Sequence, residues 1–421
     1  MATQVPDSGW QARFFTIWGG QAFSLVGSAL VRFALIWWLT AETESATVLT
    51  TATLVSMLPF IVLAPLSGAL VDRWNRRWVM VISDALIALL TAVLAYLYWL
   101  DVVEIWHVYL VLFLRAFGDV FQSPAMQAST SLMVPRRHLI RVAGANDLLM
   151  GVVSIVSPPL GALLVETVSM QGTLAIDLVT AVLAIGPLLF IQIPQPEPRD
   201  RKARSESFWQ EMTAGFRYVW EWRGLFFLFV ALAAMRFFLA PAFSLLPLMV
   251  TDHFKGGAFE LAWVNSAHGI GFITGGLILS VWGGLKRRSV TALLGLTGVG
   301  IFSLVFGLVP AGAFGLAMVV MFIRAAMIPM MRSSVMTIFQ THVPPDMQGR
   351  VFTLLLSSIS MMAPFGLGLA GPIAESFGVP TVFVITGVGC LVIAAIWAFN
   401  PTILHLEDHA QGRAVADASS D

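Results

Sequence analysis

Nine charged residues lie inside long apolar segments of the sequence, where ionisable side chains are rare and usually functional. They are five arginines and four aspartates: Arg32, Arg115, Arg236, Arg324, Arg332, Asp84, Asp119, Asp147 and Asp177. An arginine at the centre of a membrane helix costs about 2.5–3.5 kcal/mol on insertion scales. We therefore expect these side chains to face the interior of a helix bundle, to pair with one another, or to reach toward the membrane surface.

Asp119 is the strongest candidate for a carboxylate that takes up and releases a proton. It is the one acid expected near the middle of its segment, and Arg115 lies one turn away on the same helix face. Burial opposes the negative charge on Asp119, whereas Arg115 favours it, so the two effects could be balanced against each other. Asp177 and Arg32 form the rival pair at a shallower depth. A purely structural ion pair is the alternative for both.

Other polar residues in the apolar segments could line a substrate cavity. Arg236 and Arg324 have no acid in the segments of their own half, so they could bind an anionic group or pair elsewhere. His268 is expected to be a structural histidine rather than a proton carrier. The 30 phenylalanines and 19 methionines mostly serve packing, although a subset could form an adaptable apolar pocket. The uncharged candidates for the cavity are Gln21, Gln122, Asn146 and Asn265.

The composition determines which elements must position these residues. Hydrophobic residues make up 57% of the 421 residues and charged residues only 11%, against about 25% in soluble domains. The apolar residues form long blocks without the alternation of a β-barrel, and in lipid a helix satisfies its own backbone. We expect an all-α integral membrane protein with twelve transmembrane helices. The blocks lie near 14–41, 46–71, 78–100, 105–133, 139–167, 172–193, 224–251, 258–283, 290–310, 312–341, 350–376 and 380–400.

The loop charges predict an orientation. Of the 24 lysines and arginines, 18 lie in the terminal segments and loops of one side, whereas the other side has only Lys255. The positive-inside rule then makes both termini cytoplasmic in a multi-pass protein of the cell membrane. The expected parts are an N-terminal six-helix bundle (1–193), a cytoplasmic linker (194–223), a C-terminal six-helix bundle (224–400) and a cytoplasmic tail (401–421). Within the linker, an amphipathic stretch from Phe208 to Trp222 could lie on the membrane surface or act as a solvated tether.

The two halves also resemble each other. At a constant offset of 209 residues, Arg115 corresponds to Arg324, Arg141 to Arg350 and Glu166 to Glu375. Duplicated six-helix halves are typical of secondary transporters, in which the binding site lies between the halves near the membrane midplane.

One loop carries a recognisable motif. The segment after the second block reads Gly68-Ala-Leu-Val-Asp72-Arg73-Trp-Asn75-Arg76-Arg77 and resembles the signature loop of the major facilitator superfamily. Asn75 stands where that motif has a turn glycine, and asparagine tolerates a positive φ. The resemblance implies that Gly68, Asp72, Arg73, Arg76 and Arg77 belong to an inner gate. In that family the acid docks on the eleventh helix, which here begins near Arg350.

A second motif points to export. The fifth block contains Ser157-Pro158-Pro159-Leu-Gly161-Ala162, which is similar to the antiporter motif of drug exporters; an ordinary proline-kinked helix is the alternative. The fourth block, from Leu114 to Ala125, resembles the macrolide-efflux proteins in the drug–proton antiporter branch. The resemblance implies alternating access and export of a lipophilic or amphipathic molecule, with proton antiport. Siderophore or metabolite export is the alternative, because related exporters share these features. It also implies that Pro158 and Gly161 take part in gating.

Other functional classes lack their sequence signals. No lysine follows a glycine, so a phosphate-binding loop for an ATP-driven pump is missing, and no H-E-x-x-H zinc motif occurs among the seven histidines. A membrane-embedded lipid enzyme remains a weaker alternative. The net charge is zero, which gives nucleic acid no overall attraction. We expect a monomer without metal or cofactor, whose partners are a small-molecule substrate, protons and the lipid bilayer.

Overall fold

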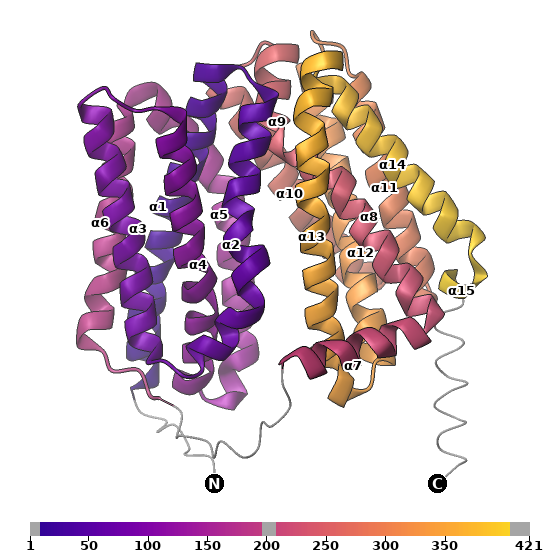
Figure 1. Ribbon diagram of the computed structural model, residues 1–421, viewed down its shortest axis with the longest axis horizontal. Helices are drawn as coiled ribbons and strands as arrows, with labels where there is room; N and C mark the ends of the chain where they lie inside the picture. Colours follow the sequence, from indigo (N-terminus) through magenta and orange to yellow (C-terminus); the bar gives the residue numbers. More distant parts are fainter. Residues whose placement is uncertain (1–8, 196–207, 405–421) are drawn as a thin grey trace. The chain divides into compact units, whose positions relative to one another are not determined.

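The computed structural model describes residues 9–195 and 208–404, and every regular element in them is helical (Figure 1). The basic cluster Arg199, Arg201, Lys202 and Arg204 and the tail from residue 405 lie outside the described residues. Eleven described helices are long and apolar enough to cross a bilayer. The predicted fourth span is the exception: it forms the 29-residue helix α4 (Ile105–Met133), but it is not one of the eleven. Its polar residues, among them Arg115, Asp119 and Gln122, lower its mean hydropathy.

The helices fall into two compact units. The first unit contains α1, most of α2, α3 to α6 and residues Gly256–Ser266, the latter including the start of α10 (Ala258–Trp282). Within it α1 packs against α4, α5 and α6, and α3 packs against α4 and α6. These contacts bring four helices around the charged residues of the N-terminal half. The bounds are α1 Trp10–Thr43, α2 Ala46–Val71, α3 Arg76–Trp99, η1 Arg136–His138, α5 Leu139–Thr167 and α6 Met170–Phe190.

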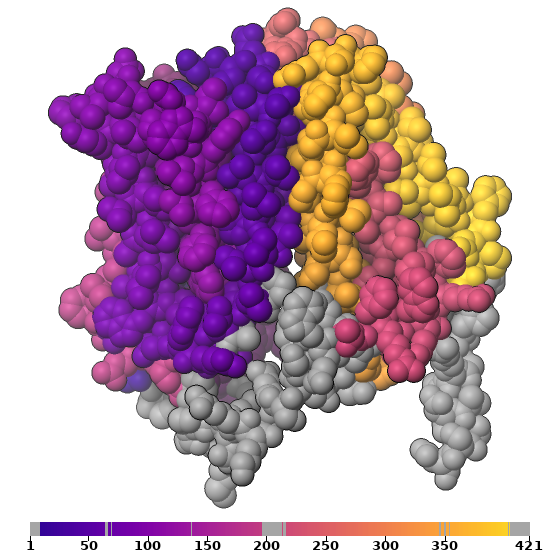
Figure 2. Space-filling model, viewed as in Figure 1, coloured from indigo at the N-terminus to yellow at the C-terminus, as the bar shows by residue number. Residues whose placement is uncertain are grey.

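The second unit contains most of the remaining helices. Within it α13 packs against α8 and α14, and α11 packs against α12 and α14. In Figure 2 the side chains of α13 and α8 fill the space that separates their ribbons in Figure 1. The bounds are α7 Phe208–Glu221, α8 Arg223–Ser244, α9 Leu246–Leu248, η3 Met249–His253, α11 Arg288–Leu308, α12 Phe314–His342, α13 Pro345–Phe377, α14 Val379–Phe399 and α15 Pro401–Leu404.

Two departures from the expected helices have local causes. The block near 224–251 is interrupted at Leu245, where Pro247 in the next turn has no backbone N–H to continue the helix. The stretch expected to be amphipathic forms α7, which runs crosswise to α8 and α13 and packs against both (Figure 1). Phe216 and Trp220 on α7 stack on each other and are exposed, as expected of a helix at a membrane surface.

Candidate functional site

Small residues allow the helices of the first unit to approach closely around its charged residues. A methyl group on Gly27 of α1 would overlap the Thr180 hydroxyl of α6 and come within 3.2 Å of Asp177 Oδ1. On α4, a methyl group on Gly118 would lie 3.1 Å from the Ile87 side chain of α3. These glycines place polar side chains of α1, α3, α4 and α6 within hydrogen-bonding reach of one another.

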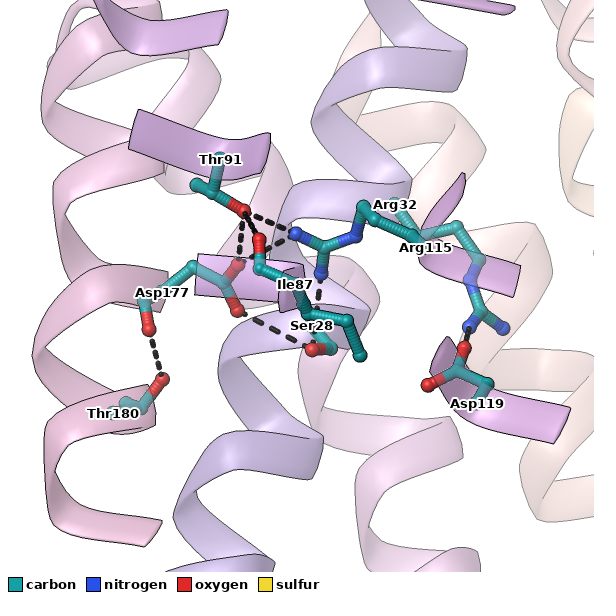
Figure 3. Close-up of polar contacts among 8 residues, drawn as sticks. All are labelled: Ser28, Arg32, Ile87, Thr91, Arg115, Asp119, Asp177 and Thr180. Atoms are coloured by element: carbon teal, nitrogen blue, oxygen red, sulfur yellow. Dashed lines mark hydrogen bonds and ion pairs between the residues drawn. The ribbon is translucent and has the colours of Figure 1, made fainter. Parts of the chain in front are cut away.

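A buried ion pair joins α4 to α6. Arg115 Nη1 lies 2.7 Å from Asp177 Oδ2, and both side chains are buried (Figure 3). Thr91 Oγ1 on α3 donates to the same carboxylate oxygen at 2.8 Å and also accepts a hydrogen bond from Arg115. Ser28 on α1 accepts from Arg115 Nη2 at 3.0 Å and donates to Asp177 Oδ1 at 3.3 Å. We call Ser28, Thr91, Arg115 and Asp177 the first polar layer.

A second, more exposed pair lies beside this layer. Arg32 Nη2 on α1 is 3.8 Å from Asp119 Oδ2 on α4, and the two side chains are 69% and 34% exposed (Figure 3). The expected pairing of Asp119 with Arg115 and of Asp177 with Arg32 is therefore wrong, and the partners are exchanged. The Arg115 side chain extends into the unit toward α3 and α6, whereas Asp119, one turn further, faces the exposed side where Arg32 lies. An arginine four residues before an acid is also the weaker order for a pair within one helix.

Asp84 on α3 has a different environment. The residue is 3% exposed, and its carboxylate accepts hydrogen bonds from Gln21 Nε2 on α1 at 2.7 Å and from Gln122 Nε2 on α4 at 3.3 Å. Gln122 also donates to Gln21 Oε1. Among the described residues, no ion pair reaches Asp84. We call Gln21, Asp84 and Gln122 the second polar layer; its two glutamines, expected to line a substrate cavity, bind this carboxylate.

The signature loop is stabilised within the first unit. Asn75 has a φ of −70° and accepts hydrogen bonds from the backbone N–H groups of Arg77 and Trp78, so it is the N-cap of α3. The expected positive φ at this position is therefore wrong; the asparagine provides a cap instead of a left-handed turn. Arg76 is buried and donates to Asp72 Oδ1 at 3.1 Å and to the Ala128 carbonyl at 3.2 Å.

The remaining gate residues have separate environments. Arg77 donates to the Leu188 and Leu189 carbonyls at the end of α6, whereas Arg73 is exposed. Gly68 lies in α2, with open space where a Cβ would be. Pro158 lies inside α5, and a methyl group on Gly161 of that helix would come within 2.8 Å of the Phe33 ring on α1. The glycine thus permits close packing of α1 and α5.

The other candidate cavity residues have separate hydrogen-bonding partners or are exposed. Asn146 Oδ1 accepts from Trp18 Nε1 at 2.6 Å, and Asn265 Nδ2 donates to the Leu261 carbonyl of its own helix at 3.0 Å. In the second unit Arg324 is buried, with Nε donating to Ser303 Oγ at 2.7 Å, whereas Arg236 is exposed. His268 lies against the Phe243 ring. In the described part of the chain, no group of three or more His, Cys, Asp or Glu side chains could hold a metal ion.

Ser28 and Thr91 were not identified from the sequence, although a signal for them exists. The three helices that contribute to both layers each repeat a polar residue after seven positions: 21 and 28 on α1, 84 and 91 on α3, and 122 and 115 on α4. Seven residues are about two helical turns, so such residues return to the same helix face about 10 Å further along. A search for polar residues at this spacing would have grouped Ser28 and Thr91 with the charged residues.

Comparisons with known proteins agree with this architecture. The macrolide efflux protein A of Streptococcus pyogenes is 33% identical over 387 residues, which cover 92% of this chain and 95% of the relative. The multidrug efflux pump Tap of Mycolicibacterium fortuitum is 26% identical over 393 residues, with 90% and 94% covered. These relatives are transporters rather than enzymes, which removes the lipid-enzyme alternative.

Solved structures show the same fold at low sequence identity. A bacterial homologue of the lysosomal transporter Spinster, in an inward-facing conformation, matches with a TM-score of 0.71 and 13% identity, covering 93% of this chain and 97% of the homologue. A POT family transporter in complex with a peptide conjugate matches with a TM-score of 0.72 and 12% identity, covering 94% and 96%. The family described as transmembrane secretion effector matches residues 10–414. The chain belongs to this family of the major facilitator superfamily and is a multi-pass membrane transporter.

Proposed function

We propose that the protein exports a lipophilic or amphipathic small molecule, macrolide-like in character, in exchange for protons. The observation that carries this proposal is the 33% identity to macrolide efflux protein A over 92% of the chain. A similarity that spans nearly every helix favours a shared transport cycle more than a shared fold alone. Siderophores and other endogenous metabolites are the second substrate class, because the described contacts do not select among amphipathic molecules.

The proposal includes a topology. We infer twelve spans, with α4 as the one outside the eleven most apolar helices, arranged as six-helix bundles at 1–193 and 224–400. The linker 194–223, the tail 401–421 and both termini are cytoplasmic in this proposal, and the working unit is a monomer in the cell membrane. Support for α4 as a span comes from its length of 29 residues and its packing against α1 and α3. Its charged side chains pair with those of other helices, Arg115 with Asp177 of α6 and Asp119 with Arg32 of α1.

Proton antiport requires carboxylates that can change charge within the bundle. We propose Asp119 for this role because its side chain is partly exposed and its distance to Arg32 is 3.8 Å, which leaves the pair free to separate. The pair of Arg115 and Asp177 is buried and held by Thr91 and Ser28, so its role in the proposal is to keep α3, α4 and α6 together. Arg236, which is exposed, is the proposed contact for an anionic group on a substrate, and the polar residues Asn146 and Asn265 and the buried Arg324 complete the candidate set.

Transport in proteoliposomes tests the function. The full-length protein would be reconstituted and given a panel of radiolabelled macrolides and siderophores, with and without an imposed pH gradient. We expect a macrolide to accumulate in the acidic compartment, and a protonophore to abolish the accumulation. Accumulation of siderophores alone would support the second substrate class. Uptake that is the same with and without the pH gradient would contradict proton antiport.

A further inference from the structure

We propose that Asp84 is a proton-binding site of this transporter, in which the aspartate is a neutral carboxylic acid in one state and an ion in another. Its place in the transport cycle rests on the proposed proton antiport, but the binding of the proton does not. The site differs from the pair of Asp119 and Arg32, which lies on the exposed side of the first unit. It consists of the second polar layer: Gln21, Asp84 and Gln122.

The charges of the two layers carry the argument. In the first polar layer, Asp177 is offset by Arg115 at 2.7 Å. The second polar layer repeats the pattern two turns away on α1, α3 and α4, but glutamine occupies the α4 position that arginine has in the first. Asp84 therefore has amide partners and no cation among the described residues. A buried carboxylate without a cation is strongly disfavoured as an ion, and protonation removes that cost.

The titratable groups that face Asp84 do not supply the missing charge. Asp119 from α4 and Asp177 from α6 are both acids, and each already has its own arginine. On α1, Arg32 lies three turns beyond Gln21 and pairs with Asp119. Arg115 and Arg32 thus offset Asp177 and Asp119, and Asp84 is the acid of the three that has no arginine partner. This group of two arginines and three aspartates has no net charge when Asp84 holds a proton.

The glutamines can accommodate both charge states. Each amide presents a carbonyl oxygen and an NH2 group at the same distance from the helix, and a half-turn of the amide exchanges them. With the NH2 groups toward Asp84, as described, both carboxylate oxygens accept hydrogen bonds. After a half-turn of both amides, the Gln21 carbonyl oxygen accepts the O–H of the protonated acid, and the Gln21 NH2 group donates to the Gln122 carbonyl oxygen. The proton leaves Asp84 for water, and no other bond is broken.

The second polar layer is most exposed on the Gln122 side, which is the side from which a proton would reach it. Gln122 is half-buried, whereas Gln21 and Asp84 are buried. Gln122 also lies three residues from the partly exposed Asp119 on the same face of α4. A sodium ion fits this site less well than a proton does. A metal cation needs several oxygen ligands, whereas the described contacts direct two amide NH2 groups at the carboxylate.

Infrared spectroscopy tests proton binding without any substrate. The full-length protein in lipid nanodiscs would be titrated with acid, and the carbonyl band of a protonated carboxylic acid recorded. We expect one band to disappear in Asp84→Asn and to remain in Asp119→Asn. Gln122→Leu should shift its midpoint, whereas the matched control Gln127→Leu should not, because Gln127 is exposed and its described side-chain hydrogen bond is to Ser123. The Gln122→Leu comparison keeps the test decisive if Asp84→Asn does not fold.

The outcomes separate the site from the function. A band that persists in Asp84→Asn would overturn the site, and so would its displacement by sodium at constant ionic strength. Loss of the band together with loss of pH-driven accumulation supports the proposal, with Gln127→Leu retaining both. Loss of the band with intact accumulation would overturn the role of Asp84 in coupling. If the wild type shows the band but transports no compound of the panel, the proposed function fails and the site stands.

Discussion

Asp177 on α6 forms its buried ion pair with Arg115 of α4, at 2.7 Å, and not with Arg32 of α1. The pair lies inside the first unit, where Thr91 and Ser28 each form hydrogen bonds with both side chains. Removal of one member of a buried pair leaves the other charge uncompensated, which costs more than the pair itself contributes. The first polar layer therefore holds four helices together: α1, α3, α4 and α6.

Because the first polar layer holds these helices together, we expect one isosteric substitution in it to lower the stability of the protein strongly. Asp177→Asn keeps the size of the side chain but leaves the buried Arg115 without a counter-ion, and we expect a loss of about 3–5 kcal/mol in the free energy of unfolding. Asp119→Asn is the matched control, because its pair is partly exposed and should contribute less than about 1 kcal/mol. Thermal unfolding in detergent measures both variants. Equal melting temperatures for the two variants would contradict a stabilising role of the buried pair of Arg115 and Asp177.

Close packing of α1 against α6 makes a second prediction. In Gly27→Ala the added methyl group would overlap the Thr180 hydroxyl and approach Asp177, so we expect a loss of about 1–3 kcal/mol from overpacking. Gly19→Ala, on the same helix with open space at its Cβ position, should instead be neutral or gain up to about 1 kcal/mol. The same unfolding assay compares them. Identical behaviour of the two alanine variants would mean that α1 and α6 are further apart than described.

Two substitutions of Asn75 in the signature loop distinguish helix capping from a left-handed turn at this position. Asn75→Ser retains a side-chain oxygen for the Arg77 and Trp78 N–H groups, whereas Asn75→Ala removes it at a cost of about 1 kcal/mol. We expect hydrogen exchange at the start of α3 to accelerate in the alanine variant and to stay near the wild-type rate in the serine variant. Serine is no better than alanine in a left-handed conformation, so equal acceleration in both variants would favour a turn requirement instead.

Helices and their approximate limits could be predicted from the sequence, because the run of apolar residues needed to cross a bilayer is a local property. The amphipathic segment that forms α7 followed from its periodicity in the same way. Ion-pair partners could not be predicted, because depth along a helix does not reveal the direction in which a side chain points. Arg115 has an acid one turn away, yet the rotation of α4 directs it to Asp177. The role of Asn75 was missed because a motif position was interpreted through the glycine that other sequences have there.

The predicted orientation in the membrane can be tested by cysteine labelling, because the sequence has a single cysteine, Cys390. Cys390 is buried in an apolar cluster, so Cys390→Ala, which buries no hydroxyl group, gives a cysteine-free background. On it, Glu44→Cys and Trp74→Cys place exposed thiols at opposite ends of α2. A membrane-impermeant maleimide added to intact cells should label position 44 and reach position 74 only after permeabilisation. The reverse pattern would contradict cytoplasmic termini and the orientation inferred from the loop charges.

Coupling at the Asp119 and Arg32 pair is tested by a variant that fixes one charge state. Asp119→Asn mimics the protonated acid, so it should bind and exchange substrate yet fail to concentrate it against a gradient. The physical reason is that the amide cannot attract Arg32 in one state and release it in the other, so the pH gradient no longer biases the two conformations. Counterflow and pH-driven accumulation, measured on the same proteoliposomes, separate exchange from coupling.

Asp119→Glu is the conservative control and should restore part of the accumulation, because a carboxylate one methylene longer can still reach an arginine 3.8 Å away. Full pH-driven accumulation by Asp119→Asn would make the pair structural and would leave Asp84 as the coupling carboxylate of the first unit.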